Sequence, residues 1–174
     1  MLYPFALSTL AALTDEPISL SGARSAMQLQ GKFPLPTSVD KAWAYVSDPT
    51  KVIECVPGLQ TYTVGENKRI AATVRVSIGF IRGTFQTNTK VVKEDPSTHT
   101  AALELSGTGA GSGFNAAVNI AVAAAGAASE LAWDANVSIS GPLGGLAKPL
   151  IEGNVKKIIG QLFDCVKAKL SQSV

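Results

Sequence analysis

The stretch LSGTGAGSGFNAAVNIAVAAAGAAS, residues 105–129, lies between Glu104 and Glu130 and contains no charged residue. Three structures are compatible with so long an uncharged run: a membrane-spanning helix, a glycine-rich phosphate loop followed by a helix, and a hairpin of two strands beside an apolar interior. Each structure implies a different class of function. The choice among them therefore decides both the fold and the kind of site to expect.

Two patterns within the stretch favour the hairpin. The glycines of Gly107–Gly113 are spaced as GxGxGxG, which is not the GxGxxG dinucleotide fingerprint, and no GK[ST] follows them. Beyond the glycines every second residue faces the same way, as in a strand, and asparagines argue against a membrane helix. The alternating residues are Phe114, Ala116, Val118, Ile120 and Val122. The glycines then form a bend between two long strands.

The same alternation recurs along the chain and predicts further strands with one apolar and one polar face. Such strands, when joined by short turns, form an antiparallel sheet. Acidic and basic residues lie on different strands of the polar face, which suits cross-strand ion pairs. The predicted strand ranges are Gln28–Leu35, Lys68–Phe80, Ile81–Val91, His99–Leu105 and Glu130–Ile139.

Three helical segments complete the pattern. Thr37 and Ser38 suit the N-cap of a helix over Val39–Ser47, and Asp48-Pro49 ends it before a second short helix over Pro49–Cys55. Apolar residues at helical spacing predict a long helix from Leu143 to Leu170. We therefore expect an α+β fold in which a curved seven-stranded antiparallel sheet wraps around the C-terminal helix, with two short helices after the first strand. A cavity between sheet and helix is the expected result.

Composition excludes several classes of protein. The 174 residues suit one domain, which we place at 27–174, after an extension over residues 1–26 that is either poorly structured or a short membrane-surface helix. A net charge of +2 is too small to indicate a nucleic-acid partner. Cys55 and Cys165 are far apart and outside CxxC spacing, so we predict neither a disulfide framework nor a zinc site, and we expect a reducing, cytoplasmic setting.

Few residues could support catalysis. His99 is the one histidine and lies beside a predicted turn, and Ser112 lacks the flanking glycines of a GxSxG nucleophile motif. We predict no catalytic residue, no metal site and no covalently bound cofactor. An enzyme of this fold would have to use Thr87, Thr89 or His99, the polar side chains whose strand parity directs them inward.

Six motifs recur in a characteristic order and spacing along the chain. They are Gly31-Lys32-Phe33, Val39–Trp43 with Asp48-Pro49, Cys55-Val56-Pro57-Gly58, Ser77–Phe85, the Gly107–Gly113 bend and Val137–Gly141. In these motifs the chain resembles the CoxG family, that of the G subunit of carbon monoxide dehydrogenase, within the START-like (SRPBCC) helix-grip superfamily. The resemblance covers roughly residues 27–171 and rests on the order and spacing of the motifs. The resemblance implies a hydrophobic ligand pocket, recruitment of a molybdenum-containing carbon monoxide dehydrogenase to the membrane, and handling of an isoprenoid quinone.

Strand parity gives the residues expected to line that pocket. They are Val76, Ile78, Phe80, Phe85, Leu103, Leu105, Phe114, Val118, Ile120 and Trp133, closed by Leu143, Leu146 and Leu150. Two segments are expected to frame the entrance, namely Val56, Pro57 and Gly58 in one loop and Gly109 and Gly111 in the bend.

The residue patterns and the resemblance together predict a non-enzymatic carrier of an apolar ligand, such as a lipid or an isoprenoid quinone, that works in the cytoplasm at the membrane surface. The resemblance implies a molybdenum hydroxylase-type carbon monoxide dehydrogenase as its partner. Two alternatives stay open: a cyclase or hydrolase acting on an aromatic or polyketide-like substrate, and an assembly scaffold whose pocket is filled core.

Overall fold

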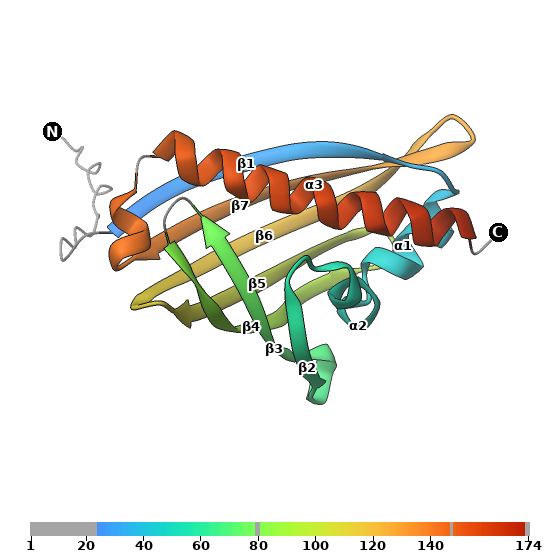
Figure 1. The fold of residues 1–174 in the computed structure, drawn as a ribbon. Helices are drawn as coiled ribbons and strands as arrows, with labels where there is room; N and C mark the ends of the chain where they lie inside the picture. The colour runs from blue at the N-terminus through green and yellow to red at the C-terminus, as the bar shows by residue number, and fades with distance from the viewer. Residues whose placement is uncertain (1–23, 79–80, 147, 173–174) are drawn as a thin grey trace, which may run out of the picture.

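The computed structural model describes residues 24–78, 81–146 and 148–172. Seven strands and three α-helices follow one another in the predicted order (Figure 1). The strands are β1 (Arg24–Leu35), β2 (Leu59–Val64), β3 (Ile70–Ile78), β4 (Ile81–Asp95), β5 (Thr100–Gly109), β6 (Ser112–Ala125) and β7 (Ala128–Ser140). The helices are α1 (Val39–Val46), α2 (Pro49–Val52) and α3 (Lys148–Gln172), with short 3₁₀ turns η1 (Ile53–Cys55), η2 (Glu66–Lys68) and η3 (Pro142–Gly145).

All seven strands belong to one antiparallel sheet in the order β1-β7-β6-β5-β4-β3-β2. The first strand therefore pairs with the last, and the other strands follow as a meander. The sheet curves around α3, and α1 and α2 lie at the end of the sheet near the C-terminus of that helix (Figure 1). The predicted fold class is confirmed.

The short helices form where the sequence supplies caps. The Ser38 hydroxyl accepts a hydrogen bond from the Lys41 amide at 3.4 Å and begins α1, which buries Trp43 and Val46. The Asp48 carboxylate accepts from the Thr50 amide at 3.0 Å, and Pro49 occupies the first turn of α2. Both predicted helices are confirmed.

The glycine-rich stretch is a strand bend, as predicted. Ala110 and Gly111 make the two-residue turn between β5 and β6, with φ values of 51° and 74°. Two positive φ values in succession give the turn a twist that matches that of the strands it joins. Close approach explains a neighbouring glycine, since a Cβ at Gly109 would collide with the carbonyl oxygen of Thr84.

Charged side chains of the outer face pair across strands. Lys90 of β4 lies opposite Glu104 of β5, with Nζ and Oε1 3.5 Å apart, and Lys32 of β1 approaches Glu130 of β7. The predicted cross-strand ion pairs are therefore present. Both pairs are solvent-exposed, so each contributes little to stability.

The structure refines three boundaries. Strand β1 begins at Arg24, which pairs with Ser140, so the last part of the predicted extension belongs to the sheet; residues 1–23 lie outside the described residues. Strand β2 has no alternating pattern of burial, which explains why periodicity gives it no range. Helix α3 begins at Lys148 rather than Leu143, because Leu143 belongs to the η3 turn over Pro142–Gly145.

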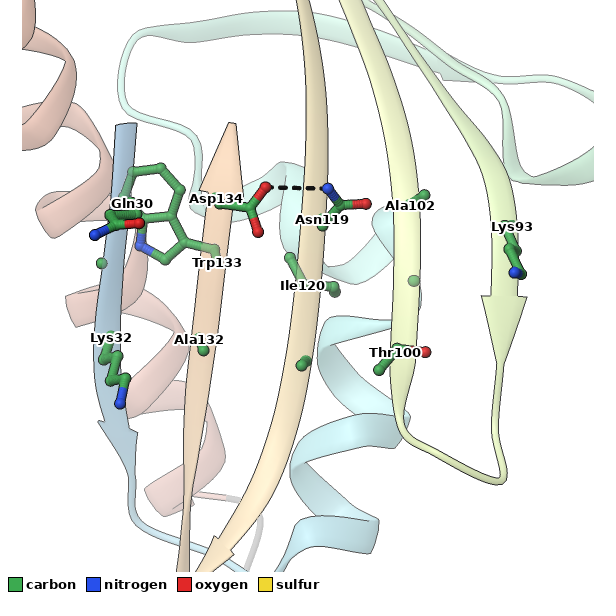
Figure 2. A pocket seen from close by; sticks show the side chains of 13 residues that line it. Gln30, Lys32, Lys93, Thr100, Ala102, Asn119, Ile120, Ala132, Trp133 and Asp134 are labelled. Carbon is green, nitrogen blue, oxygen red and sulfur yellow. Dashed lines mark hydrogen bonds between the residues drawn. The ribbon is translucent and has the colours of Figure 1, made fainter. Parts of the chain in front are cut away.

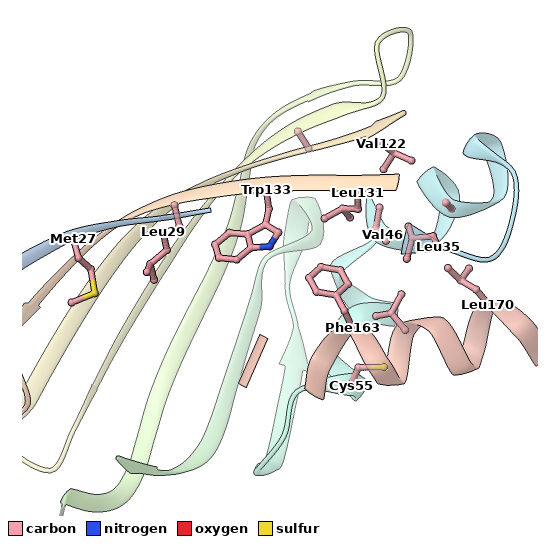
Figure 3. Close-up of a cluster of buried hydrophobic side chains, with 14 of the residues drawn as sticks. Met27, Leu29, Leu35, Val46, Cys55, Val122, Leu131, Trp133, Phe163 and Leu170 are labelled. Atoms are coloured by element: carbon pink, nitrogen blue, oxygen red, sulfur yellow. The ribbon is translucent and has the colours of Figure 1, made fainter. Parts of the chain in front are cut away.

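The buried apolar side chains form two clusters. The small cluster consists of Ile53 of η1 and of Ile70, Ala72 and Val74 of β3. The large cluster joins the sheet to α1 and α3, and Figure 3 shows most of it. Its members are Met27, Leu29, Leu35, Ala42, Trp43, Val46, Cys55, Ile81, Phe85, Ala101, Val122, Leu131, Trp133, Ala135, Ile139, Leu143, Ile151, Phe163, Val166 and Leu170.

Candidate functional site

A pocket of about 250 Å³, which we call the inner pocket, lies between the inner face of the sheet and the helices. The strands contribute one wall, α3 a second, and the segment from α1 to η1 a third. Its lining residues come from all of these elements. They are Val46, Pro49, Val52, Ile53, Val56, Ile70, Thr89, Leu103, Leu105, Val118, Ile120, Leu131, Trp133, Ala135, Ile159, Leu162 and Phe163.

Register explains how the strand wall is built. Leu103, Val118 and Ala135 lie opposite one another on β5, β6 and β7, so their side chains share the inner face. Facing them, Ile159 and Phe163 stand one turn apart on α3. At these positions the wall is made of small and medium side chains, which leaves space where larger residues would meet the helix.

Part of the predicted lining is present. Leu103, Leu105, Val118, Ile120 and Trp133 line the inner pocket, together with Val56, which the sequence places at its entrance. They come from the middle of β5, β6 and β7 and from the loop after η1. That these residues bind a ligand stays a prediction.

Other predicted lining residues lie elsewhere. Near the β5–β6 turn and η3, Val76, Phe85, Phe114, Leu143 and Leu146 pack in or against the large cluster and do not line the inner pocket. The rings of Phe85 and Phe114 contact one another at 6.5 Å between centroids. Here the space between sheet and helix is filled with aromatic side chains.

Leu150, which is predicted to close the pocket, is 39% exposed and is not among the residues that line the inner pocket. The helix buries Ile151 instead, and consecutive positions of an α-helix point about 100° apart. Phe80 and the side chain of Ile78 lie outside what the structure describes.

Four residues predicted at the entrance do not line the inner pocket: Pro57, Gly58, Gly109 and Gly111. Gly58 has a φ of 84°, and its carbonyl accepts the Arg75 amide at 2.8 Å. Gly58 therefore anchors its loop to β3, and Gly109 and Gly111 lie at the bend between β5 and β6.

Sequence reasoning missed the helical wall. Pro49, Val52 and Ile53 form too short an apolar run to show which way they face. Neither Ile159 nor Phe163 is among the apolar residues at helical spacing that predict the last helix, which are Leu143, Leu146, Leu150, Val155, Ile158, Leu162, Val166 and Leu170. Thr89, which strand parity directs inward, does line the pocket. Thr87 instead donates its hydroxyl to the Ala72 carbonyl at 3.1 Å.

His99 lies away from the pocket. Its ring meets Trp43 edge to face at 5.8 Å, and its Nε2 is 3.6 Å from Asp40. His99 therefore fixes the β4–β5 turn against α1, rather than pointing a titratable group at the apolar interior.

The outer face of the sheet carries two larger hollows, of about 520 and 550 Å³. Figure 2 shows the first, where Asn119 of β6 donates a hydrogen bond to Asp134 of β7 at 3.0 Å between Lys32 and Lys93. Exposed polar side chains and several alanines line these hollows. They are depressions of a twisted sheet, so the inner pocket is the better candidate for a ligand site.

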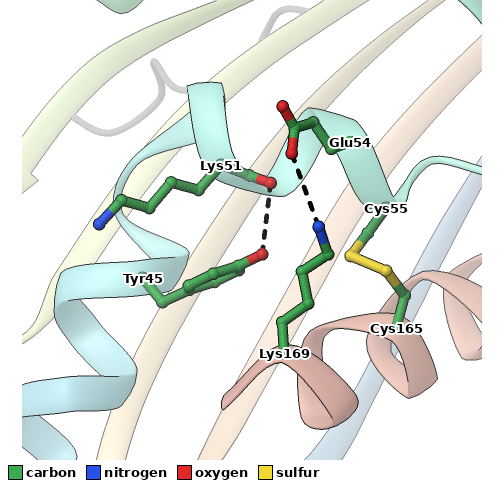
Figure 4. The surroundings of a disulfide bond; sticks show 6 residues. All are labelled: Tyr45, Lys51, Glu54, Cys55, Cys165 and Lys169. Carbon is green, nitrogen blue, oxygen red and sulfur yellow. Dashed lines mark hydrogen bonds and ion pairs between the residues drawn. A yellow bond between two sulfur atoms is a disulfide. The ribbon is translucent and has the colours of Figure 1, made fainter. Parts of the chain in front are cut away.

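Cys55 and Cys165 form a disulfide, contrary to the sequence prediction (Figure 4). It connects η1 to α3, and the Cα atoms are 5.5 Å apart. The two cysteines are 110 positions apart and match no disulfide motif, so the sequence did not indicate that they pair. The fold places both of them beside the pocket wall. The expected reducing setting rested on unpaired cysteines, and that argument no longer holds.

Polar contacts surround the disulfide. Lys169 lies 3.6 Å from Glu54, and Tyr45 donates its hydroxyl to the Lys51 carbonyl at 3.4 Å (Figure 4). Burial raises the pKa of Tyr45, and the hydrogen bond that Tyr62 donates to Glu54 raises the pKa of Tyr62. Both phenols therefore stay neutral near pH 7.

The described residues contain neither a metal-binding cluster nor a helix that could span a membrane. No group of three or more histidine, cysteine, aspartate or glutamate side chains among them could hold a metal ion. Within the same part of the chain, no helix has both the length and the apolar character that crossing a membrane requires.

Comparison with solved structures supports the fold. A conserved protein from Geobacillus kaustophilus has a TM-score of 0.78 and 19% identity, over 84% of this chain and 97% of that one. A START superfamily protein from Mycobacterium smegmatis has a TM-score of 0.62 and 15% identity, over 84% and 99%. The Zhui aromatase/cyclase from Streptomyces sp. R1128 has a TM-score of 0.60 and 11% identity, over 84% and 94%.

These identities are low enough that the structures show the fold alone. No curated protein sequence matches the chain significantly. The family model for the G subunit of carbon monoxide dehydrogenase (CoxG) matches residues 31–171, which run from the middle of β1 to the last turn of α3. The chain therefore belongs to the CoxG family.

Proposed function

We propose that this protein is a carrier that binds an apolar ligand in the inner pocket. The observation that carries the proposal is the lining: among the described lining residues, Thr89 and Trp133 are the only ones with a polar side-chain atom. Burial of apolar ligand surface there contributes about 25 cal/mol per Å². A lipid or an isoprenoid quinone has the required character.

The size of the pocket sets how such a ligand fits. Typical pockets for small molecules measure about 300–1,000 Å³, and the inner pocket measures about 250 Å³. It suits a ring or a short chain. A ligand with a long hydrocarbon tail would extend out of the pocket, where a membrane or a partner protein could receive it.

The lining supports a carrier over an enzyme of the same fold. Cyclases and hydrolases transfer protons through titratable side chains, and the described lining residues include no acid, no base and no thiol. Thr89 has a hydroxyl but no neighbouring base among them. A pure scaffold has no need of a pocket.

The family description adds a partner. We propose that the protein acts beside a carbon monoxide dehydrogenase of the molybdenum hydroxylase type, at the membrane surface. Co-expression of the two proteins tests this part, with co-elution and vesicle flotation as measurements. A chain that neither co-elutes with the enzyme nor floats with vesicles would contradict the partner and leave the ligand proposal intact.

A paired substitution tests ligand binding. Val118→Phe places a ring in the inner pocket, whereas Ala117→Phe places the same ring on the outer face of the same strand. We expect the apolar fluorophore N-phenyl-1-naphthylamine to bind the wild type and Ala117→Phe alike, and Val118→Phe at least about tenfold more weakly. Equal binding by all three proteins would exclude the inner pocket as the site.

Extraction identifies the natural ligand. Mass spectrometry of organic extracts should find an apolar compound with the wild type and much less of it with Val118→Phe. Extracts that contain no lipid or quinone from either protein count against the carrier function.

A further inference from the structure

The Cys55–Cys165 disulfide joins two walls of the inner pocket. Cys55 lies in η1 between the lining residues Ile53 and Val56, and Cys165 lies on α3 three positions after the lining residue Leu162. Neither cysteine lines the pocket itself. Figure 4 shows the bond crossing from η1 to α3. The bond therefore holds the two walls together without occupying the space between them.

The ion pair beside the disulfide is a weak connection between the same two walls. Lys169 of α3 lies 3.6 Å from Glu54 of η1, and the two side chains are 40% and 52% exposed. Water and salt screen a pair as exposed as this one. Of the two contacts, the covalent bond is the one that keeps η1 against α3.

The segment that carries Cys55 is a short unit, residues 49–57, that can open without unfolding the sheet. It contains the four-residue α2 and the three-residue η1. Its far end is anchored to β3, where the Gly58 carbonyl accepts the Arg75 amide at 2.8 Å. Small units of this kind open locally at a lower free energy than the whole fold. Breaking the bond to α3 should therefore ease the opening of this wall.

The rest of the fold should survive the loss of the bond. Cys55 is 6% exposed and belongs to the large cluster, whose other members join the sheet to α1 and α3. A reduced cysteine packs as a small apolar side chain and is often buried, so Cys55 keeps its place as a thiol. Domains of this size bury enough surface to fold without disulfides.

A reductant can approach the bond from the side of Cys165, which is partly exposed. Exposed disulfides are the more readily reduced ones. One thiolate of a dithiol attacks the Cys165 sulfur, and the Cys55 sulfur leaves as a thiolate that takes up a proton. The second thiol then displaces Cys165 as a free thiol and closes a disulfide within the reductant. Two electrons and two protons thereby pass to the protein.

We infer that the Cys55–Cys165 disulfide is a thiol-exchange site through which a dithiol reductant controls the inner pocket. The oxidised protein retains its ligand, and the reduced protein releases it between η1 and α3. This inference rests on the proposed carrier function.

Release of a probe from the folded protein tests the inference. Stopped-flow fluorescence follows the loss of N-phenyl-1-naphthylamine from the wild type on dilution, with and without dithiothreitol. Reduction should speed release at least about fivefold, because opening of the α2–η1 segment no longer works against the bond. Thiol titration should find both cysteines free, and far-UV circular dichroism should stay unchanged.

Two variants separate release from stability. Cys55→Ala/Cys165→Ala should release the probe as fast as the reduced wild type, with or without reductant. Leu35→Ala is the matched control, because it removes a buried side chain that does not line the pocket. It should keep the slow release of the oxidised wild type although the protein is less stable, and dithiothreitol should speed its release as well. Reduction of the wild type decides the question even if the double variant does not fold.

The outcomes distinguish the two proposals. If the probe binds neither the oxidised nor the reduced protein, the carrier function fails and this inference fails with it. If the probe leaves the oxidised and the reduced protein at the same rate, or if Leu35→Ala alone speeds release as much as reduction does, this inference alone is overturned. A bond that dithiothreitol cannot reduce until the protein unfolds overturns it too.

Discussion

The large and small clusters differ in how completely they fill the space that they enclose. The large cluster includes side chains with almost no exposure, among them Leu131, Ile151 and Val166 at 0%. The small cluster has four members, and only partly buried residues flank it, among them Val56 and Tyr62. One region is a packed core, and the other is a thin apolar layer.

The inner pocket lies where these two regions meet. Its lining takes Ile53 and Ile70 from the small cluster and Leu131, Trp133 and Phe163 from the large one. Between the clusters, Leu103 and Val118 of the strand wall belong to neither buried set and leave space that no side chain fills. Leu131 is fully buried in the large cluster and also lines the pocket, so some side chains both stabilise the fold and bound the space.

The largest expected effect comes from truncating the large cluster away from the pocket. Leu35→Ala should lower the free energy of unfolding by about 3 kcal/mol, because Leu35 is 1% exposed and its loss leaves a cavity. Chemical denaturation measures this change. N-phenyl-1-naphthylamine should still bind, since Leu35 does not line the inner pocket.

Lys32→Ala, on the outer face of the same strand, is the control and should change the free energy of unfolding by less than about 0.5 kcal/mol. Equal losses for Leu35→Ala and Lys32→Ala would refute the description of the large cluster as a packed core.

Removing the disulfide should have the next largest effect. The η1 turn contributes Ile53 to the small cluster and Cys55 to the large one. The disulfide from Cys55 to Cys165 therefore fixes a segment that both clusters share to α3. The Cys55→Ala/Cys165→Ala variant should lose about 2–3 kcal/mol of unfolding free energy. Amide exchange should quicken first in η1.

Reduction of the wild type should reproduce the loss seen in the double variant, and the same reductant should not affect the variant. A wild type whose denaturation midpoint is the same with and without reductant would show that the cysteines are not paired in solution.

Strand parity predicted which face of a strand is apolar, but it could not predict where along the strand a pocket remains between the sheet and the helices. Leu105 and Phe114 have the same parity on neighbouring strands, yet the first lines the pocket and the second packs against Phe85. The difference depends on what the helices place opposite. The position of α2 in the pocket wall and the disulfide likewise depend on contacts between residues distant in sequence, which periodicity does not record.

A matched pair of small deletions compares the two clusters directly. Ile151 and Ile70 are 0% and 1% exposed, so Ile→Val removes the same methyl group from each cluster. We expect a loss of about 1–1.5 kcal/mol at Ile151 and about 0.5–1 kcal/mol at Ile70. The side chain of Ile70 borders the pocket and already lacks contacts on one side.

Differential scanning calorimetry and probe binding together test this pair. Ile70→Val should also enlarge the pocket and change the affinity for N-phenyl-1-naphthylamine, whereas Ile151→Val should not. A greater loss of stability at Ile70 than at Ile151 would reverse the comparison and place the tighter packing in the small cluster.

The smallest expected effect lies on the outer face, directly behind the pocket. Lys90 and Glu104 are neighbours in sequence of the lining residues Thr89 and Leu105, but their side chains point to solvent and lie 3.5 Å apart. A double-mutant cycle with Lys90→Ala and Glu104→Ala should give a coupling of about 0.2–0.5 kcal/mol that shrinks as salt is added. Probe affinity should stay the same in all members of the cycle, because the sheet backbone separates this pair from the ligand. A change in affinity that follows the loss of the ion pair would mean that the outer face controls the shape of the pocket wall, and the two faces of the sheet would then not act independently.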